Sequence, residues 1–354
     1  MSDTLRAGLI GLSGISAGRS SPGAQPGWGI RMPSRHAAAY HYVPDTEVVA
    51  VCDIVPAAIE KFKADWLAEW PEVHAYADYR EMLAKEKLDI VSVATGDHLH
   101  AQMVVDAAAA GAKGIICEKP IATTLADSDR MIAAVERARI PMLVDHTRRW
   151  MFPWVQAARA IKEGAIGAVL RIEAKEGGSR AMLFRNGTHL IDSLVWMAGG
   201  SPKAIYGLTE ERFPTYGPRY AGDGGKNPDT DPAVSALVEF DNGVRAFINM
   251  CKFTPDFFEL DIFGTKGRML VQEDDVCVTI KSDAYGFQTS RLPRDHYTQG
   301  AVAGCVTEMV HLIRHGGAPS SDGREARKTL EIMLGILQSQ AKGGVRLVCP
   351  LRDA

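Results

Sequence analysis

The segment of this chain best suited to do chemistry is Glu118-Lys119-Pro120, a lysine between a glutamate and a proline. It follows the apolar run 114–117 and precedes Thr124, a residue type that often caps the start of a helix. This pattern predicts that Lys119 lies at the carboxyl end of a parallel strand, where ligands bind in open α/β sheets. An ammonium group there can hold a hydroxyl and share in its proton transfer. A bare tripeptide of this kind is more typical of a solvated surface pair, so the interpretation depends on the rest of the chain.

The elements that must position Lys119 alternate between short apolar runs and helical patterns. The predicted strands are residues 6–11, 48–52, 89–94, 114–117 and 142–144. The helical patterns between them are residues 36–42, 56–70, 98–110 and 124–138. Continuous apolar strands separated by helices predict a parallel sheet covered on both faces. Right-handed crossovers then wind it into a doubly wound, dinucleotide-binding Rossmann fold.

After about Trp150 the pattern changes. Strand-like segments follow one another at residues 169–174, 203–210, 233–240, 244–250, 257–263, 268–271 and 276–281. Helices are expected at residues 152–162, 189–197, 296–314 and 323–342. Asn242-Gly243 between two strands predicts a hairpin, because Asn-Gly readily adopts positive φ. We therefore expect an α/β Rossmann domain at residues 1–148 and an α+β domain at 149–354, with an open, mostly antiparallel sheet and a cleft between the domains.

Composition limits the function classes. The 354 residues carry a net charge of −3 without basic clusters, which argues against nucleic-acid or anionic-membrane partners. The apolar runs are strand-sized, and the first one begins too early to leave room for a signal peptide. The six cysteines form no C-x-x-C pair, so we expect neither a disulfide framework nor a metal site. These features favour a cytoplasmic enzyme.

A glycine-rich turn ends the first predicted strand, at Gly11-Leu12-Ser13-Gly14-Ile15. Glycines there allow a tight turn and close approach of the backbone to a pyrophosphate. The match to G-x-G-x-x-G is imperfect, since a register that starts at Gly11 meets Ser13 and Ser16. A simple glycine turn is an equal alternative for the motif alone. The strand before it, the helix after it and an acidic residue at the end of the second strand favour the cofactor interpretation.

That acidic residue is Asp53. A carboxylate at this position accepts hydrogen bonds from ribose hydroxyls and repels a 2′-phosphate, which favours NAD over NADP, although NADP stays possible. The alternative is an aspartate that caps the next helix. The separation of Gly11 from Asp53 exceeds the usual spacing of about 20 residues. The excess lies in the loop 17–33, either a surface insertion or a lid whose arginines contact the cofactor phosphates.

Taken together, these segments resemble the family of glucose–fructose oxidoreductase, inositol dehydrogenase and the rhizopine-catabolism oxidoreductases (Gfo/Idh/MocA). The resemblance covers essentially the whole chain and rests on segments 49–53, 95–100, 118–120, 189–192 and 263–267. It implies an NAD(P)-dependent dehydrogenase or reductase that acts on sugars, inositols or their derivatives. It also implies a second domain that often mediates assembly into homo-oligomers such as dimers or tetramers.

The resemblance also implies roles for single residues. Lys119 contacts substrate and cofactor, and Glu118 lies beside the nicotinamide ribose. Thr95, His98 and His100 belong to the cofactor set. His189 lies near the reacting carbinol, where an imidazole can take the hydroxyl proton. Asp192, one helical turn later, either orients His189 or forms a salt bridge elsewhere. The expected substrate-binding residues are Arg149, Arg185, Asn186 and Asp192.

One position departs from the family. Many members carry an aspartate in a proton relay where this chain has Arg185, four residues before His189. An arginine stays protonated and cannot act as the base. It either binds an anionic substrate such as a sugar acid or points to solvent, and Lys119 with His189 remain the minimum acid–base set. We expect an NAD-dependent oxidoreductase that interconverts a secondary alcohol and a ketone on a sugar, inositol, sugar acid or related polyol. The alternatives are an NAD-dependent glycoside hydrolase that uses transient oxidation and a non-catalytic dinucleotide-binding sensor.

Overall fold

The structure is a computed structural model that describes residues 4–19, 24–25, 29–30, 33–213, 216–222, 227–273, 275–282, 286–293 and 300–351. The chain divides into two compact units. Unit 1 comprises Met1–Ala122, Asp127–Trp150 and His296–Arg324. Unit 2 comprises Thr123–Ala126, Met151–Asp295 and Glu325–Ala354.

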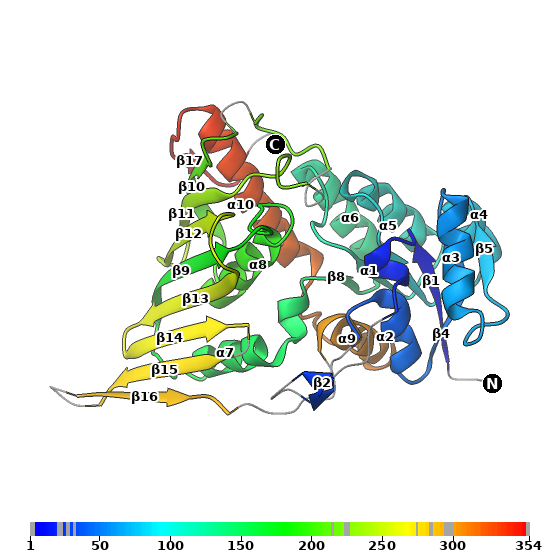
Figure 1. Ribbon diagram of the computed structural model, residues 1–354, viewed down its shortest axis with the longest axis horizontal. Coiled ribbons are helices and arrows are strands. Elements are labelled where there is room, and N and C mark those ends of the chain that lie inside the picture. Colours follow the sequence, from blue (N-terminus) through cyan, green and yellow to red (C-terminus); the bar gives the residue numbers. More distant parts are fainter. Residues whose placement is uncertain are drawn as a thin grey trace. The chain divides into compact units, whose positions relative to one another are not determined.

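Unit 1 is built on a six-stranded parallel sheet (Figure 1). Its order is β5 (His74–Tyr76), β4 (Thr46–Cys52), β1 (Leu5–Ile10), β6 (Ile90–Val93), β7 (Gly114–Cys117) and β8 (Met142–Val144). All residues of β6, β7 and β8 are buried, which explains their continuous apolar sequences. The chain winds outward from β1 to β5 and then crosses to β6, so the direction of winding reverses between β1 and β6. The predicted doubly wound Rossmann sheet is confirmed.

Helices accompany these strands. They are α1 (Gly14–Ala17), α2 (His36–Tyr42), α3 (Pro56–Trp66), α4 (Tyr79–Lys85), α5 (His100–Ala109) and α6 (Leu125–Ala138), with short 3-10 turns η1 (Asp97–Leu99) and η2 (Thr147–Trp150). The edge strand β5 and helix α4 are absent from the sequence prediction. Strand β5 has only three residues and none of them is fully buried, so it lacks the apolar run that marks the other strands.

Helix α9 (Ala301–His315) lies in unit 1, whereas the sequence prediction placed all of residues 149–354 in a second domain. Val302, Val306 and Met309 on this helix are buried in the same core as Tyr40 of α2. The chain thus returns to unit 1 late in the sequence, because one face of that sheet needs a cover that α9 supplies. Residues 296–299, expected at the start of this helix, lie outside the described residues.

Unit 2 contains a nine-stranded sheet. Its order is β16 (Phe287–Arg291), β15 (Val276–Lys281), β14 (Gly267–Gln272), β13 (Phe257–Gly264), β9 (Val169–Gly177), β12 (Arg245–Cys251), β11 (Val234–Phe240), β10 (Pro202–Thr209) and β17 (Leu347–Val348). Strands β9 and β12 run parallel and the other neighbouring pairs run antiparallel, as expected for an open, mostly antiparallel sheet. Gly243 has φ +89° in the β11–β12 hairpin, which confirms the turn predicted at Asn242-Gly243.

Helices α7 (Phe152–Lys162), α8 (Gly187–Ala198) and α10 (Gly323–Ala341) pack on this sheet. Burial alternates strictly along β12, so one face of the sheet is covered and the other is exposed. Within the loop 17–33, β2 (Ala24–Gln25) pairs with β3 (Gly29–Ile30). None of the helices described is long and apolar enough to cross a membrane.

Candidate active site

The glycine turn after β1 is held against two neighbouring strands. Gly11 has φ +88°, and a Cβ there would lie 2.5 Å from the carbonyl oxygen of Ala94, so a side chain does not fit. The Leu12 amide donates to Asp53 Oδ2 at 2.7 Å. Ser13 and Gly14 are exposed, and a Cβ on Gly14 would meet nothing within 4 Å. The turn is therefore rigid at its base and open at its tip, as close approach of a phosphate requires.

Asp53 follows β4 and contributes to two backbone segments. Its Oδ2 accepts from Leu12 N, and its Oδ1 accepts from Val55 N at 2.9 Å, just before α3. Asp53 therefore also supports the start of α3, which was the alternative role expected from the sequence. The carboxylate is half-buried, and each oxygen retains a second lone pair for a ligand hydroxyl. Both interpretations of Asp53 are compatible with this geometry.

The turn after β6 carries Thr95, His98 and His100. Thr95 is half-buried and His98 is exposed on η1. His100 is fully buried at the start of α5. Its Nδ1 lies 3.0 Å from the Pro120 carbonyl oxygen and its Nε2 lies 3.3 Å from that of Thr95. His100 therefore links the segments that follow β6 and β7 and holds the backbone of Thr95 in place.

Lys119 follows β7 and is half-buried, with a cis peptide bond to Pro120. Its backbone amide donates to Glu118 Oε2 at 3.2 Å. Glu118 Oε1 lies 3.1 Å from Nε2 of His36, the first residue of α2. Asp145 follows β8, and its Oδ2 lies 3.7 Å from the same His36 nitrogen. His36 and Asp145 were not predicted from the sequence, because neither belongs to a motif and only the fold brings them to Glu118.

This cluster has unusual electrostatics. Burial lowers the pKa of His36, but the hydrogen bond to Glu118 and the charges of Glu118 and Asp145 outweigh it, so the net shift is upward. Burial raises the pKa of Glu118, whereas the hydrogen bond and charge of His36 bring it below its ordinary value. Burial, together with the charge of Glu118, raises the pKa of Asp145 to about 7. An anionic glutamate beside an imidazolium is the favoured state.

In unit 2, His189 lies in the first turn of α8. The helix is preceded by Asn186, whose carbonyl oxygen accepts from His189 N at 2.9 Å. A Cβ on Gly187 would lie 2.8 Å from Met250 Cε and 2.9 Å from the Met182 carbonyl oxygen, so this start of the helix is closely packed. His189 is 8% exposed and Asp192 is fully buried one turn later. Arg185 and Asn186 are half-buried.

The segment before α8 is braced by the ends of the loop 219–231. The Phe184 ring stacks on Tyr220 with centroids 3.6 Å apart, and the Phe184 amide donates to Asp231 Oδ1 at 3.1 Å. Tyr220 and Asp231 are both buried. Both ends of this loop are therefore packed within unit 2. Residues 223–226 lie outside the described part. Phe184, Tyr220 and Asp231 belong to no sequence motif and were not predicted as part of the site.

Two arginines have other partners than a ligand. Arg149, expected to bind substrate, is 4% exposed, and its Nη1 donates to the Ser320 carbonyl oxygen at 2.9 Å. This contact makes it a link within unit 1. Arg19 of the loop 17–33 donates to the Asp65 carbonyl oxygen and to Glu69 at 2.8 Å, so it is bound to α3. Trp28 and Arg31 of the same loop lie outside the described residues.

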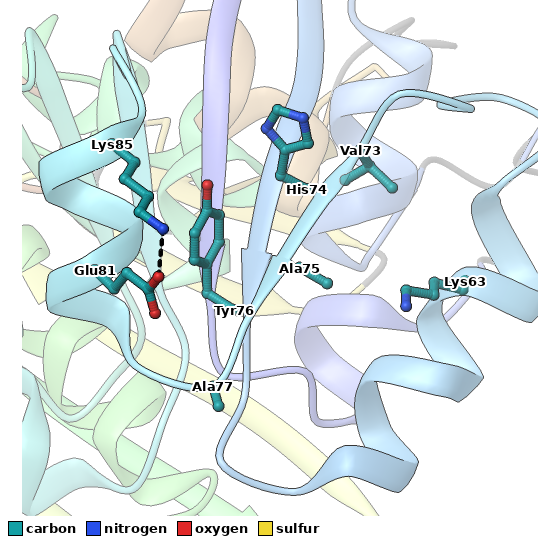
Figure 2. A pocket seen from close by; sticks show the side chains of 8 residues that line it. All are labelled: Lys63, Val73, His74, Ala75, Tyr76, Ala77, Glu81 and Lys85. Atoms are coloured by element: carbon teal, nitrogen blue, oxygen red, sulfur yellow. Dashed lines mark hydrogen bonds and ion pairs between the residues drawn. The ribbon is translucent and has the colours of Figure 1, made fainter.

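Unit 1 also has an open hollow of about 500 Å³ beside β5 (Figure 2). Its lining residues are Lys63, Val73, His74, Ala75, Tyr76, Ala77, Glu81 and Lys85. None of the expected site residues lies there, and Lys85 is paired with Glu81 at 2.5 Å. The candidate site is therefore the carboxyl edge of the sheet, with Gly11, Asp53, Thr95 and Lys119. His189, Asp192, Arg185 and Asn186 form a second set within unit 2.

The carboxyl edge of a doubly wound sheet with a glycine turn and an acidic residue defines the class of NAD-binding Rossmann oxidoreductases. Comparison with known families agrees. Residues 27–146 match the model described as "Oxidoreductase family, NAD-binding Rossmann fold", and residues 154–270 match the "GFO/IDH/MocA C-terminal domain". The chain belongs to the Gfo/Idh/MocA oxidoreductase family.

Several curated relatives are named as dehydrogenases. The chain is 27% identical over 336 residues to D-apiose dehydrogenase of Paraburkholderia graminis, covering 87% of this chain and 84% of the relative. It is 23% identical to myo-inositol 2-dehydrogenase of Thermotoga maritima, covering 85% and 90%. In fold it resembles the WlbA dehydrogenase of Bordetella pertussis in complex with NADH and UDP-GlcNAcA, with a TM-score of 0.73 and 20% identity, over 99% of this chain and 100% of the other.

Proposed function

We propose that this chain is an NAD-dependent dehydrogenase that interconverts a secondary alcohol and a ketone on a sugar, inositol, sugar acid or related polyol. The observation that carries the proposal is the sheet edge of unit 1. There the turn at Gly11, the carboxylate of Asp53 and the half-buried Lys119 follow β1, β4 and β7 of one parallel sheet. The sugar and polyol dehydrogenases among the relatives support the substrate class.

The residues of the chain manage binding and the proton. The nicotinamide cofactor, when bound, supplies the hydride acceptor or donor. The open tip at Ser13 and Gly14 receives its phosphates, and Asp53 accepts hydrogen bonds from its adenosine ribose. Lys119 holds the reacting hydroxyl and takes part in its proton transfer, and His189 acts as the second acid–base group. Glu118, fixed by His36, keeps the turn at Lys119 in place.

Arg185 provides the substrate preference in this proposal. It stands four residues before His189, on the braced segment that begins α8. A guanidinium can bind a carboxylate through two parallel hydrogen bonds. We expect it to bind the acidic group of a sugar acid, with Asn186 and Asp192 completing the contacts. A variant Arg185→Gln should then lose more activity on sugar acids than on neutral sugars.

We also propose a homo-oligomer. Leu208, Phe247 and Phe257 are partly exposed on β10, β12 and β13, whose helix-free face carries them. Exposed apolar side chains gathered on one face are typical of subunit interfaces. Light scattering on the purified chain should give twice or four times the monomer mass.

The decisive experiment follows the reduced-nicotinamide absorbance band with NAD or NADP against sugars, inositols and sugar acids. Growth of the band with one substrate class supports the proposal. Tight cofactor binding without net reduction contradicts it, and points to transient oxidation by a glycosidase or to a sensor.

Asp53→Asn tests the cofactor preference. The amide oxygen can still accept from Leu12 N or Val55 N, but the charge is lost. We expect NAD affinity to fall about tenfold and NADP affinity to fall less or to rise, since the 2′-phosphate is no longer repelled. Equal losses for both cofactors, measured by fluorescence titration, would contradict the assignment.

A further inference from the structure

Three ionisable side chains meet in the core of unit 1, next to Lys119. His36 begins α2, Glu118 follows β7 and Asp145 follows β8. Their ligand-type atoms all lie within 4.8 Å of one another, and His36 and Asp145 are 0% and 1% exposed. The parallel pairing of β7 with β8, continued by Asp145 N donating to the Cys117 carbonyl oxygen at 2.8 Å, fixes Asp145 beside Glu118.

The hydrogen bonds in this cluster are unevenly shared. Glu118 accepts from His36 Nε2 and from Lys119 N. Neither carboxyl oxygen of Asp145 accepts a hydrogen bond from any residue that the structure describes. Its contact with His36 Nε2, at 3.7 Å, is too long for one. A buried carboxylate without donors is costly, so Asp145 favours its protonated form.

The charged groups that face Asp145 oppose one another. Burial and the charge of Glu118 raise the pKa of Asp145 to about 7, and the charges of His36 and Lys119 act against this rise. The other titratable neighbours are Tyr40, Cys117 and Cys305, and burial raises the pKa of each one. These three stay neutral, so Lys119, His36 and Glu118 are the charges that set the state of Asp145.

We propose that Asp145 is a positioning residue whose charge state is coupled to that of Lys119. Ionised Asp145 stabilises Lys119 as an ammonium, and protonated Asp145 removes this stabilisation, so that Lys119 more readily becomes the neutral amine that can accept the hydroxyl proton of the substrate. His36 and Glu118 neutralise each other and leave Asp145 as the adjustable charge. This inference rests on the proposed role of Lys119 as an acid–base group. It adds a residue that touches neither substrate nor cofactor.

Asp145→Asn tests the coupling, because it keeps the side-chain shape and removes the ionisation. The first readout is competitive acylation of Lys119 at a series of pH values, quantified by peptide mass spectrometry, which needs no substrate. We expect the Lys119 amine to titrate about one pH unit lower in the variant, so its labelling at a fixed pH above 7, where Asp145 of the unaltered protein is ionised, rises about tenfold. Asp106→Asn is the matched control, since Asp106 contacts Tyr79 and Gln102 on another part of unit 1.

An unchanged Lys119 titration in Asp145→Asn overturns the inference, whether or not a substrate has been found. Failure of the proposed function would be seen in a different measurement: the protein would bind the cofactor but form no NADH with any substrate. With a substrate, the acidic limb of the kcat/KM profile should shift by the same unit, which a merely structural role of Asp145 would not cause.

A second measurement uses the unaltered protein. Carboxyl carbon NMR of aspartate-labelled chain should show an aspartate that titrates near pH 7. If all aspartates titrate in their ordinary range, the inference fails. A stoichiometric metal in the purified protein, lost in Asp145→Asn, would also overturn it, since His36, Glu118 and Asp145 would then be metal ligands.

Discussion

Two regions of unit 1 pair a histidine with a glutamate, and they behave differently. At β5, His74 Nδ1 lies 2.5 Å from Glu86 Oε1, and Tyr76 and Arg6 also donate to Glu86. The His74 side chain is 64% exposed, so water competes for its contact with Glu86. At the carboxyl edge, His36 lies 3.1 Å from Glu118, with both residues buried and a second carboxylate nearby. The same residue types form a pair with an exposed histidine in one place and a cluster with a buried histidine in the other.

Two features distinguish the regions: the burial of the histidine and the presence of a second carboxylate. These features set the protonation states of the side chains. Glu86 and Glu118 both have a pKa below the ordinary value, since hydrogen bonds from their partners outweigh burial. Only beside Glu118 does a further carboxylate, Asp145, have its pKa raised into the neutral range. A lysine adjoins each region, Lys85 at the surface and Lys119 at the sheet edge. The proposed acid–base chemistry is therefore placed at the buried cluster and not at the hollow beside β5.

The largest expected effect comes from substituting each of these two lysines in a separate variant. Lys119→Met should lower kcat/KM by about 10³-fold, since acid–base groups contribute about 10²- to 10⁴-fold. NAD binding should persist, because the glycine turn and Asp53 are unchanged. Lys85→Met should stay within about twofold, because Lys85 is an exposed partner of Glu81. Steady-state kinetics of both variants measure this, and equal activities would end the comparison.

The two histidines should differ in stability. His36→Asn removes the partner of buried Glu118 and should cost about 3–5 kcal/mol of unfolding free energy, as for other broken buried pairs. His74→Asn removes a partner that is mostly exposed and should cost less than about 1 kcal/mol. Urea unfolding of both variants gives the two values. Similar losses of unfolding free energy in the two variants would show that burial does not make the His36–Glu118 pair more important for stability.

The residues of the sheet edge could be predicted from the sequence, whereas the cluster of His36, Glu118 and Asp145 could not. Lys119, Asp53 and Gly11 stand at the ends of apolar strands, so local patterns were enough to predict the Rossmann sheet and its turn. His36 and Asp145 are separated by more than a hundred residues, and only strand order and α2 packing bring them together. For Arg149 the sequence predicted a substrate contact, and the structure shows a hydrogen bond to the Ser320 carbonyl oxygen, which no local pattern indicates. The chain's return through α9 has no local signal either.

The pH dependence of stability should separate the cluster from the surface pair. Asp145 has a pKa of about 7 in the folded protein and 3.8 ordinarily, so the folded state binds more protons between these values. The stability that this group contributes is present at low pH and is lost as pH rises from about 4 to 7. Asn cannot titrate. The stability of the unaltered protein relative to Asp145→Asn should therefore fall with rising pH, by at most about 1.4 kcal/mol per unit.

Urea unfolding at intervals from pH 5 to pH 8 measures that difference directly, because the other titrating groups largely cancel between the two proteins. Parallel curves would mean that Asp145 does not titrate in this range. The pKa of Glu86 in the His74 pair lies below its ordinary value, so this carboxylate stays ionised throughout the range and does not contribute to the slope.

The smallest expected effect concerns where the cofactor lies along the sheet edge. A Cβ on Gly14 would meet no protein atom within 4 Å, so Gly14→Ala should leave the thermal midpoint unchanged. A dinucleotide phosphate that approaches this backbone would meet the new methyl group, and NAD affinity should fall about tenfold, or 1.4 kcal/mol. Gly217 also lies in open space, so Gly217→Ala is the matched control. Isothermal titration with NAD measures this affinity in both variants. Unchanged affinity in Gly14→Ala would show that the cofactor phosphates do not bind at the open tip of the turn. The glycine turn would then no longer distinguish the sheet edge from the hollow beside β5 as a cofactor site.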